Sequence, residues 1–238
     1  APPLSPARPS VPALWDNRRM DQSTGGNRTS TRAGPNADPV TLTPDLLVAR
    51  GHHRACYVHP RDPSACIKVY HRPDPKDRKR EQTAYRVLER NGADWRLLSR
   101  LLGEIDTNLG RGYVFELIRD HDGSVSRTLE HYLDPDTPEF VSNADLGPAL
   151  NELRRFLIDN RVISQEIAPR NLVFRWRADG GGDLLMIDDI GNRDYIPIRN
   201  HLAFMARNRI RLYWARFEAR LRDAYGLDLG ATSGPASG

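Results

Sequence analysis

Four polar residues in this sequence have the types and the order of a site that could hold a phosphate group with a metal ion. Lys68 ends the apolar run 65–67, and Glu81 follows thirteen residues later. Asn171 closes a loop, and Asp188 comes directly after a second apolar run. A lysine on a rigid strand can neutralise phosphate charge, and the side-chain oxygens of Asn and Asp are ligands that Mg²⁺ accepts. We therefore take this set as the candidate site.

Short strands and one helix are expected in the first half of the chain. Apolar runs predict three consecutive strands, over residues 41–48, 55–58 and 65–70. Three consecutive short strands indicate an antiparallel meander. A helix is expected over 76–90, and its Glu81, Tyr85 and Leu88 share one face. A buried strand is expected over 112–118.

The second half of the sequence is expected to be mainly helical. A strongly periodic helix over 144–160 carries one stripe of leucines, at Leu146, Leu150, Leu153 and Leu157. Residues 172–176 and 184–187 predict a β-hairpin, and a long helix is expected from near 200 to 226. Strands with one helix, followed by helices around a small hairpin, indicate an α+β protein with a bilobal plan.

The order of the candidate residues resembles that of protein kinases. Residues 65–68 are similar to the V-A-I-K strand, and residues 164–173 line up with the H-R-D-L-x-x-x-N loop. In that loop Glu166 has the position of the catalytic base and Asn171 that of a metal ligand. Asp188 is similar to the D-F-G aspartate, and the run that begins at Asp189 is the alternative alignment.

The chain is also similar to the YrbL family, the PhoP-regulatory-network proteins, a divergent branch with a protein-kinase-like fold. The segments that carry this resemblance are 51–60, 66–72, 112–115, 159–162, 169–172 and 188–191. The resemblance implies a minimal bilobal kinase-like fold, with an antiparallel N-lobe over 41–118, a mainly helical C-lobe over 119–226, and a nucleotide cleft. It favours Asp188 over Asp189.

The kinase resemblance implies ATP and Mg²⁺ as cofactors, with a role for each candidate residue. Lys68 would hold the α- and β-phosphates and Glu81 would orient it, whereas Glu166 would accept the proton of the phosphoacceptor. Metal ligands are expected among Asn171, Asp188 and, as a second candidate, Asp189. Further nucleotide contacts are expected from the turn before the second strand and from the end of the 112–118 strand, at Gly51, His53, Arg54, Glu116 and Ile118.

Several departures from the kinase pattern keep other functions open. Glu166 replaces the usual aspartate, and Ala168 replaces the lysine that would contact the γ-phosphate. Ser164 and Gln165 replace the usual His and Arg, and fewer than fifty residues follow Gly191. An inactive pseudokinase that acts as a regulatory binding module is therefore the first alternative. The phosphoacceptor or protein partner is not identified by the sequence.

Two further clusters give weaker alternatives. The last helix is rich in arginine, which permits a nucleic-acid or acidic-lipid surface, at Arg207, Arg209, Arg211, Arg216, Arg220 and Arg222. A soft-metal site could be sought among His52, His53, Cys56, His59 and Cys66. Because both cysteines fall on predicted strands that face a core, we expect no zinc site.

The length and composition of the chain exclude several classes of protein. The chain has 238 residues, with 35 Lys and Arg against 31 Asp and Glu, a formal charge of +4 and 39% hydrophobic residues. No apolar window is long enough for a membrane span, no secretory signal is visible, and two cysteines do not make a disulfide framework. We expect a cytoplasmic protein with a disordered Pro/Ser/Arg-rich tail over 1–40 and a flexible tail over 227–238.

Overall fold

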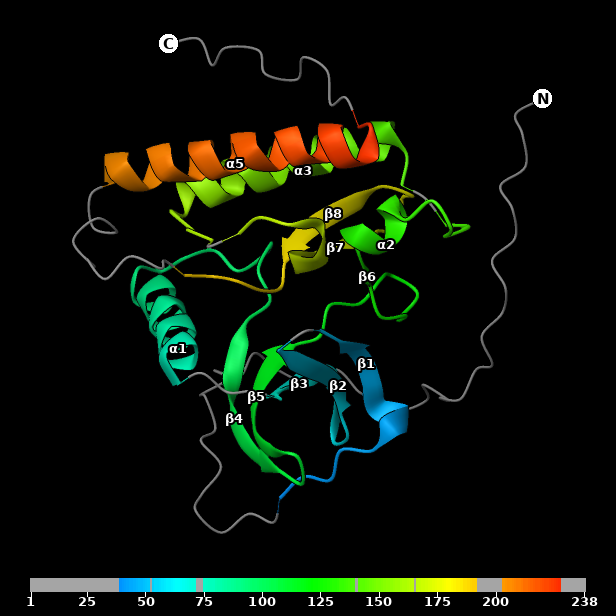
Figure 1. Cartoon of the computed structure of the whole chain (residues 1–238), viewed down its shortest axis with the longest axis vertical. Coiled ribbons are helices and arrows are strands. Elements are labelled where there is room, and N and C mark those ends of the chain that lie inside the picture. Colours follow the sequence, from blue (N-terminus) through cyan, green and yellow to red (C-terminus); the bar gives the residue numbers. More distant parts are fainter. Residues whose placement is uncertain are drawn as a thin grey trace. The chain divides into compact units, whose positions relative to one another are not determined.

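The computed structural model describes residues 39–51, 53–71, 75–139, 141–164, 166–191 and 203–227 (Figure 1). The chain divides into Ala1–Ser30 and Thr31–Gly238, and every described residue lies in the second unit. The two predicted tails fall outside the described residues except at their inner ends. At one of these ends Val40 is 2% exposed, and its N–H donates to the carbonyl oxygen of Asp106.

The first half of the described chain forms an antiparallel sheet of five strands in the order β1-β2-β3-β5-β4. The strands are β1 Leu47–Arg50, β2 Arg54–His59, β3 Asp62–Tyr70, β4 Leu101–Thr107 and β5 Gly110–Glu116. The predicted antiparallel meander is therefore confirmed for β1 to β3. These strands and the helices described below confirm the α+β class.

Two parts of this sheet differ from expectation. The strand predicted over 41–48 is wrong for most of its length, because the 3-10 turn η1, Pro44–Leu46, precedes β1. Pro44 has no N–H for a sheet hydrogen bond, and the N–H of Leu42 donates to Oδ1 of Asn108 instead. The second difference is β4, which the sequence analysis did not predict, although its residues alternate between half-buried and exposed.

The central strand β3 is buried on both faces. Ile67 and Val69 pack with Val40 and Tyr57 in a cluster on one face, whereas Cys66 belongs to the larger core on the other. Since successive side chains of a strand point to opposite faces, Lys68 lies on the same face as Cys66. This alternation directs the candidate lysine toward the larger core rather than into the small cluster.

The predicted helix after β3 is confirmed as α1, Pro75–Arg90. Its Tyr85 is 3% exposed, contacts the ring of Phe115 on β5 at 5.7 Å between centroids, and donates a 3.1 Å hydrogen bond to the carbonyl oxygen of Ser99. Tyr85 also stacks on Trp95. These contacts fix α1 on the face of the sheet that carries Lys68, and so they place Glu81 near that face.

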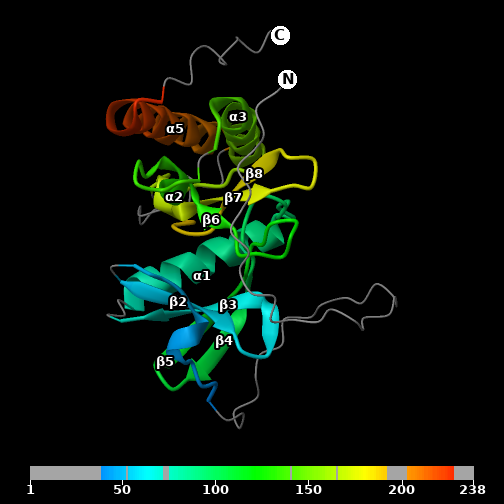
Figure 2. The ribbon, with the colours of Figure 1, turned by 90° about the vertical axis from the view of Figure 1, so that its right-hand side faces the viewer.

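The second half of the described chain contains a three-stranded sheet and three α-helices. Its elements are β6 Arg127–Thr128, α2 Leu129–Leu133, α3 Asn143–Asp159, the 3-10 turn η2 Pro169–Asn171, β7 Leu172–Trp176, β8 Gly182–Met186 and α5 Ala203–Tyr225. The predicted hairpin and the two long helices are confirmed, whereas β6 and α2 were not predicted. The leucine stripe of α3 is buried, and α3 packs on β8 and α5 (Figure 2).

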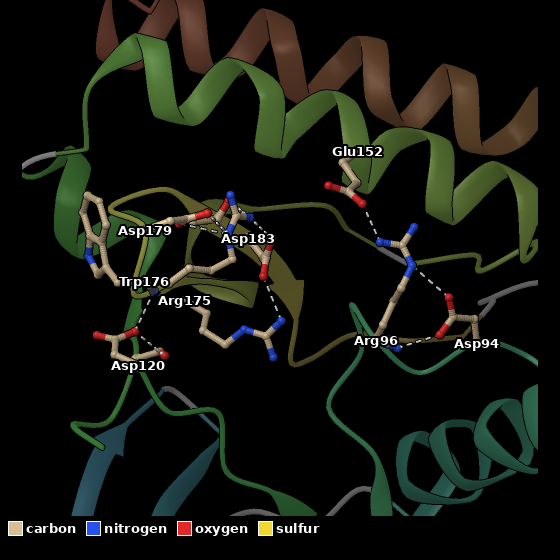
Figure 3. A network of polar contacts seen from close by, with 11 residues as sticks. Asp94, Arg96, Asp120, Glu152, Arg175, Trp176, Asp179 and Asp183 are labelled. Atoms are coloured by element: carbon tan, nitrogen blue, oxygen red, sulfur yellow. Dashed lines mark hydrogen bonds and ion pairs between the residues drawn. The ribbon is translucent and has the colours of Figure 1, made fainter. Parts of the chain in front are cut away.

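Two polar networks tie loops on either side of β4 and β5 to the strands and helices of this half (Figure 3). The buried carboxylate of Asp120, after β5, accepts hydrogen bonds from Ser126 Oγ at 2.7 Å and from the N–H of Trp176 at 2.9 Å. Arg96 pairs with both Asp94 and Glu152, which joins the loop before β4 to α3. None of the described helices combines the length and the apolar character that crossing a membrane requires.

Candidate functional site

Lys68 joins β3 to the segment that follows β8. Lys68 is 5% exposed, and its Nζ atom donates a 2.6 Å hydrogen bond to the carbonyl oxygen of Ile187. The same atom lies 4.0 Å from Oδ2 of Asp188 and 4.2 Å from the ring centroid of Phe115. The pKa of the Lys68 amine is lowered mainly by burial and to a smaller extent by the positive charge of Arg54.

Arg54 is the ionic partner of Glu81. Its Nη1 atom lies 3.3 Å from Oε2 of Glu81 and donates a 2.9 Å hydrogen bond to the hydroxyl of Tyr70, which itself donates to Glu81 Oε2 at 2.8 Å. Arg54 and Tyr70 are directly paired across β2 and β3. The expected direct pair between Lys68 and Glu81 is not formed among the described contacts, because Arg54 takes the carboxylate and Lys68 turns to Ile187.

Arg54 also forms an ion pair with Asp188 through its Nη2 atom. The sequence analysis placed Arg54 among the phosphate contacts but gave no signal for this pair, since it depends on how β2 meets the segment after β8. Two cations, Arg54 and Lys68, therefore face one carboxylate of the candidate metal set. The neighbouring carboxylate has a different environment.

Asp189 is brought together with Asn171. The Asn171 Nδ2 atom donates to Oδ2 of Asp189 at 2.7 Å and to the backbone oxygen of Glu166 at 3.2 Å, and the N–H of Ile187 donates to the Asn171 backbone oxygen. Asp189 has a φ of 58°, a left-handed conformation that is uncommon for residues other than glycine. Its N–H donates to Oδ1 of Asp188 at 2.6 Å. The two adjacent carboxylates thus contact different partners.

Glu166 is held by two arginines. Its Oε2 atom pairs with Arg170 on η2 at 2.5 Å, and its Oε1 atom pairs with Arg220 on α5 at 2.7 Å. Burial raises the pKa of the Glu166 carboxyl, but the hydrogen bond from Arg220 and the charges of Arg170 and Arg220 lower it by more, so the pKa is lowered overall. Both carboxylate oxygens of the candidate base are therefore already engaged.

The loop before Glu166 is anchored beside the aspartates. Ser164 forms an antiparallel bridge with Ile190, and the N–H of Gly191 donates to the carbonyl oxygen of Ile163. The Ser164 hydroxyl is buried and has no hydrogen-bond partner in the described part of the chain. Gln165 lies outside the described residues.

The remaining candidate residues lie at the turn between β1 and β2 and at the end of β5. The N–H of Gly51 donates to the carbonyl oxygen of Arg54, and the carbonyl oxygen of His53 accepts from the N–H of His71. The carbonyl oxygen of Glu116 accepts from Ser99 Oγ at 2.8 Å, whereas that of Ile118 accepts from the N–H of Ser126. These residues hold the turn before β2 and the end of β5 in place.

The oxygen donors at the site suit a hard divalent cation. Asp188 and Asp189 provide carboxylates, Asn171 provides an amide oxygen, and Mg²⁺ prefers such ligands. In addition, Oε1 of Glu81 is buried and has no hydrogen-bond partner among the described residues. Within the described ranges, which omit His52, no three His, Cys, Asp or Glu side chains form a group that could hold a metal ion.

The arginine-rich helix α5 is anchored by its apolar face. The residues on this face are at most 2% exposed, at Ile210, Trp214, Phe217 and Leu221. On the other side Arg209 bonds to the Tyr213 hydroxyl, and Arg216 lies over the Tyr213 ring. The expected packing of the apolar face is confirmed except for Tyr213, which is half-buried. Among these arginines, Arg220 is the one whose ion pair reaches Glu166.

The described elements define an α+β protein that gathers charged residues from β2, β3, α1 and the segment after β8, of which Lys68 is buried and the others are half-buried. A profile of the family described as PhoP regulatory network protein YrbL matches residues 40–222. The uncharacterized protein YrbL of Escherichia coli (strain K12) is 33% identical over 184 residues, which cover 76% of this chain and 87% of that relative. The Shigella flexneri protein of the same description matches to the same extent. The chain belongs to the YrbL family, as its sequence pattern indicated.

Proposed function

We propose that this YrbL-family protein has a minimal bilobal kinase-like fold and binds ATP with Mg²⁺ around Lys68. We further propose that it transfers the γ-phosphoryl group to an acceptor that is not yet identified. The observation that carries the proposal is the contact of Lys68 with Ile187 and Asp188. It brings the strand lysine close to the aspartate after the hairpin, and in protein kinases a strand lysine contacts the phosphates while such an aspartate holds Mg²⁺.

The charges around Lys68 support a phosphate site. The buried ammonium group of Lys68 lies 4.0 Å from Oδ2 of Asp188, so a phosphate bound beside that carboxylate would meet a cation there. A lowered amine pKa reflects the cost of burying this charge, and a phosphate group would offset that cost. The turn closed by Gly51 and Arg54 leads directly into the same region.

The contacts of Asn171 support Asp189 as the first metal ligand. Asn171 and Asp189 are already within hydrogen-bond distance, whereas Asp188 is paired with Arg54 and Lys68. Mg²⁺ is commonly held by one or two carboxylates together with substrate phosphates, so a complete protein cage is not needed. We therefore place Asn171 and Asp189 in the metal site, with Asp188 as a further ligand once its cations have other partners.

Glu166 would accept the proton of the acceptor hydroxyl. In the transfer step the acceptor oxygen forms a bond to the γ-phosphorus, the bond from that phosphorus to the bridging oxygen breaks, and ADP leaves. The hydroxyl proton passes to Glu166. For this role Glu166 must release at least one of its two arginines, because Arg170 and Arg220 engage both of its oxygens.

The test combines binding and transfer on the same protein. A thermal-shift series with ATP, with and without Mg²⁺, should show stabilisation that depends on both. Lys68→Ala and Asp188→Ala should each abolish ATP turnover, whereas Arg111→Ala, on the exposed side of β5, should not change it. If both site variants turn over ATP like the parent protein, the site assignment is wrong.

A second candidate function is favoured by the environment of Glu166. A carboxylate with a lowered pKa and two arginine partners is a weak base. Such a residue is compatible with an inactive pseudokinase, which acts as a regulatory binding module and needs no base. The family description refers to a PhoP regulatory network, and such a module would suit a regulatory role. Nucleotide binding without phosphate transfer, unchanged by Glu166→Ala, would decide for this function.

A further inference from the structure

Arg54 links several elements of the candidate site. From β2 its guanidinium reaches Glu81 on α1, the hydroxyl of Tyr70 on β3, and Asp188 after β8. Its side chain is 19% exposed, and those of Glu81 and Asp188 are 14% and 17% exposed. A single side chain thus ties three elements of the sheet half to the segment that carries the candidate metal ligands.

Within the described part of the chain, both cations of the network around Arg54 already have carboxylate partners. Two cations, Arg54 and Lys68, face two carboxylates, Glu81 and Asp188. A divalent cation that approaches Asp188 meets the guanidinium already paired with it, and like charges repel strongly in a partly buried site. The carboxylate and the cation can combine only after Arg54 has moved.

One oxygen atom of the network lacks a hydrogen-bond donor among the described residues in this arrangement. Oε1 of Glu81 is buried and accepts no hydrogen bond from the residues that the structure describes, although Oε2 of the same carboxylate accepts from both Arg54 and Tyr70. A buried acceptor without a donor is costly, so a second arrangement that supplies a donor to this oxygen would be favoured. Movement of Arg54 away from Asp188 gives its guanidinium, with five N–H donors, the freedom to engage both Glu81 oxygens.

We propose that Arg54 is an internal cation that keeps the site closed, and that Mg²⁺ with ATP binds by displacing it from Asp188 toward Glu81. This regulation rests on the proposed function. In this role Arg54 has an effect on nucleotide binding opposite to that of a phosphate ligand. A phosphate ligand strengthens nucleotide binding, whereas a residue that must be displaced weakens it.

The test is a Mg²⁺ titration in the presence of ATP, read by the thermal unfolding midpoint of the full chain. If the closed arrangement holds about nine-tenths of the molecules, Arg54→Met should bind about tenfold more tightly, because apparent affinity scales with the competent fraction. Arg54→Lys keeps the charge but lacks the planar fork, and it should give a smaller gain. It also serves as the second variant if Arg54→Met does not fold.

The matched control is Arg111→Met. Arg111 pairs with Glu104 and Asp106 on the same sheet, so this variant also removes an arginine with two acidic partners. Its Mg²⁺ titration should coincide with that of the parent protein. A gain of equal size in this control would show that the effect is not specific to Arg54 and would overturn the proposal.

Each remaining outcome is decisive. Weaker binding by Arg54→Met would make Arg54 a phosphate ligand, and an unchanged titration would make its ion pairs purely structural; both overturn the proposal while leaving the proposed function intact. Binding by Arg54→Met but not by the parent would support the proposal strongly. Absence of binding in parent and variants alike would overturn the proposed function and this regulation together.

Discussion

The Nζ atom of Lys68 lies 2.6 Å from the carbonyl oxygen of Ile187, although 119 positions separate the two residues in the chain. This hydrogen bond uses one of the three donors of the ammonium group, and the contact with Asp188 directs it further toward the segment after β8. The buried amine is therefore held where β3 meets that segment. Its charge depends on the few polar atoms around it.

The first prediction concerns the pH dependence of stability at Lys68. Burial lowers the pKa of this amine below its ordinary value of 10.5, so the unfolded chain binds more protons than the folded chain as the pH approaches 10.5. The contribution of Lys68 to the free energy of unfolding should therefore rise with pH in that window. Lys68→Met keeps a long side chain against Phe115 and removes the titrating group.

The measurement is the difference between the parent and Lys68→Met in urea denaturation from pH 7 to 10. As the pH rises, the free energy of unfolding of the parent protein should increase relative to that of the variant. Tyrosine titration is common to both proteins and cancels in the difference. A difference that shrinks with increasing pH would contradict the lowered pKa.

The second prediction separates the backbone role of Asp189 from its role toward a metal ion. Asn tolerates the left-handed conformation at this position, whereas Ala does not, so Asp189→Ala should be less stable than Asp189→Asn by about 1–2 kcal/mol. Both variants remove the carboxylate that contacts Asn171. Both should therefore raise the Mg²⁺ concentration required for stabilisation by ATP, by about tenfold or more.

Urea denaturation measures the first effect, and the thermal-shift titration with Mg²⁺ measures the second. If the titration is unchanged in both variants while ATP still binds, the metal role belongs to Asp188 without Asp189. Equal stability of the Ala and Asn variants would show that the left-handed backbone carries no cost at this position.

The sequence predicted the elements that carry the site better than the contacts within it. Lys68 and Glu81 were placed on a strand and a helix because hydrophobic periodicity is local, and β3 and α1 are confirmed. The pair between Arg54 and Asp188 joins segments more than a hundred residues apart. No local sequence pattern indicates which of two cations will pair with a given carboxylate in the folded protein. The sequence therefore predicted a pair of Glu81 with Lys68, whereas the structure has a pair of Glu81 with Arg54.

The same limit applies at Glu166. Its position in the loop could be aligned from the residues around it, and Arg170 is four positions away on the sequence. Arg220 comes from a helix 54 positions later, and the sequence analysis treated it as part of an arginine-rich face. Its partner became visible only once α5 was placed against the loop.

The third prediction concerns the ion pairs of Glu166. Because the pKa of the Glu166 carboxyl is lowered in the folded protein, these pairs stabilise the fold at pH values above the ordinary carboxyl pKa of 4.5, and they lose that effect as the pH falls through the folded-state pKa. Glu166→Gln should lower the free energy of unfolding at pH 7 by at most about 1 kcal/mol, since the group is partly exposed and its pairs are screened by solvent.

This loss should disappear in acid. Urea denaturation of parent and Glu166→Gln at pH 7 and below pH 4 should give curves that differ at the first pH and converge at the second. Arg220→Gln, which removes one of the two partners, should show part of the same loss. A gap that widens in acid would mean that the carboxyl is protonated more readily in the folded protein than in the unfolded chain.

The last prediction tests the close approach of β5 to β3 that positions Lys68. A Cβ atom at Gly112 would lie 2.5 Å from Cγ2 of Ile67, the residue directly before Lys68. This methyl group is on a β-branched side chain with little rotamer freedom, so it cannot move aside without shifting β3. Gly112→Ala should therefore lower the free energy of unfolding by about 1–3 kcal/mol, the range found for overpacked cores.

A second substitution shows whether this clash is the cause. Ile67→Leu moves the branch from Cβ to Cγ and nearly conserves volume, so by itself it should cost less than about 1.5 kcal/mol. In the Gly112→Ala/Ile67→Leu double variant the clash is relieved, and the two costs should add up to more than the measured loss. Simple additivity in urea denaturation would place the strain elsewhere. If the coupling is found, nucleotide binding should also be weaker in Gly112→Ala than in the double variant, because the displaced strand carries Lys68.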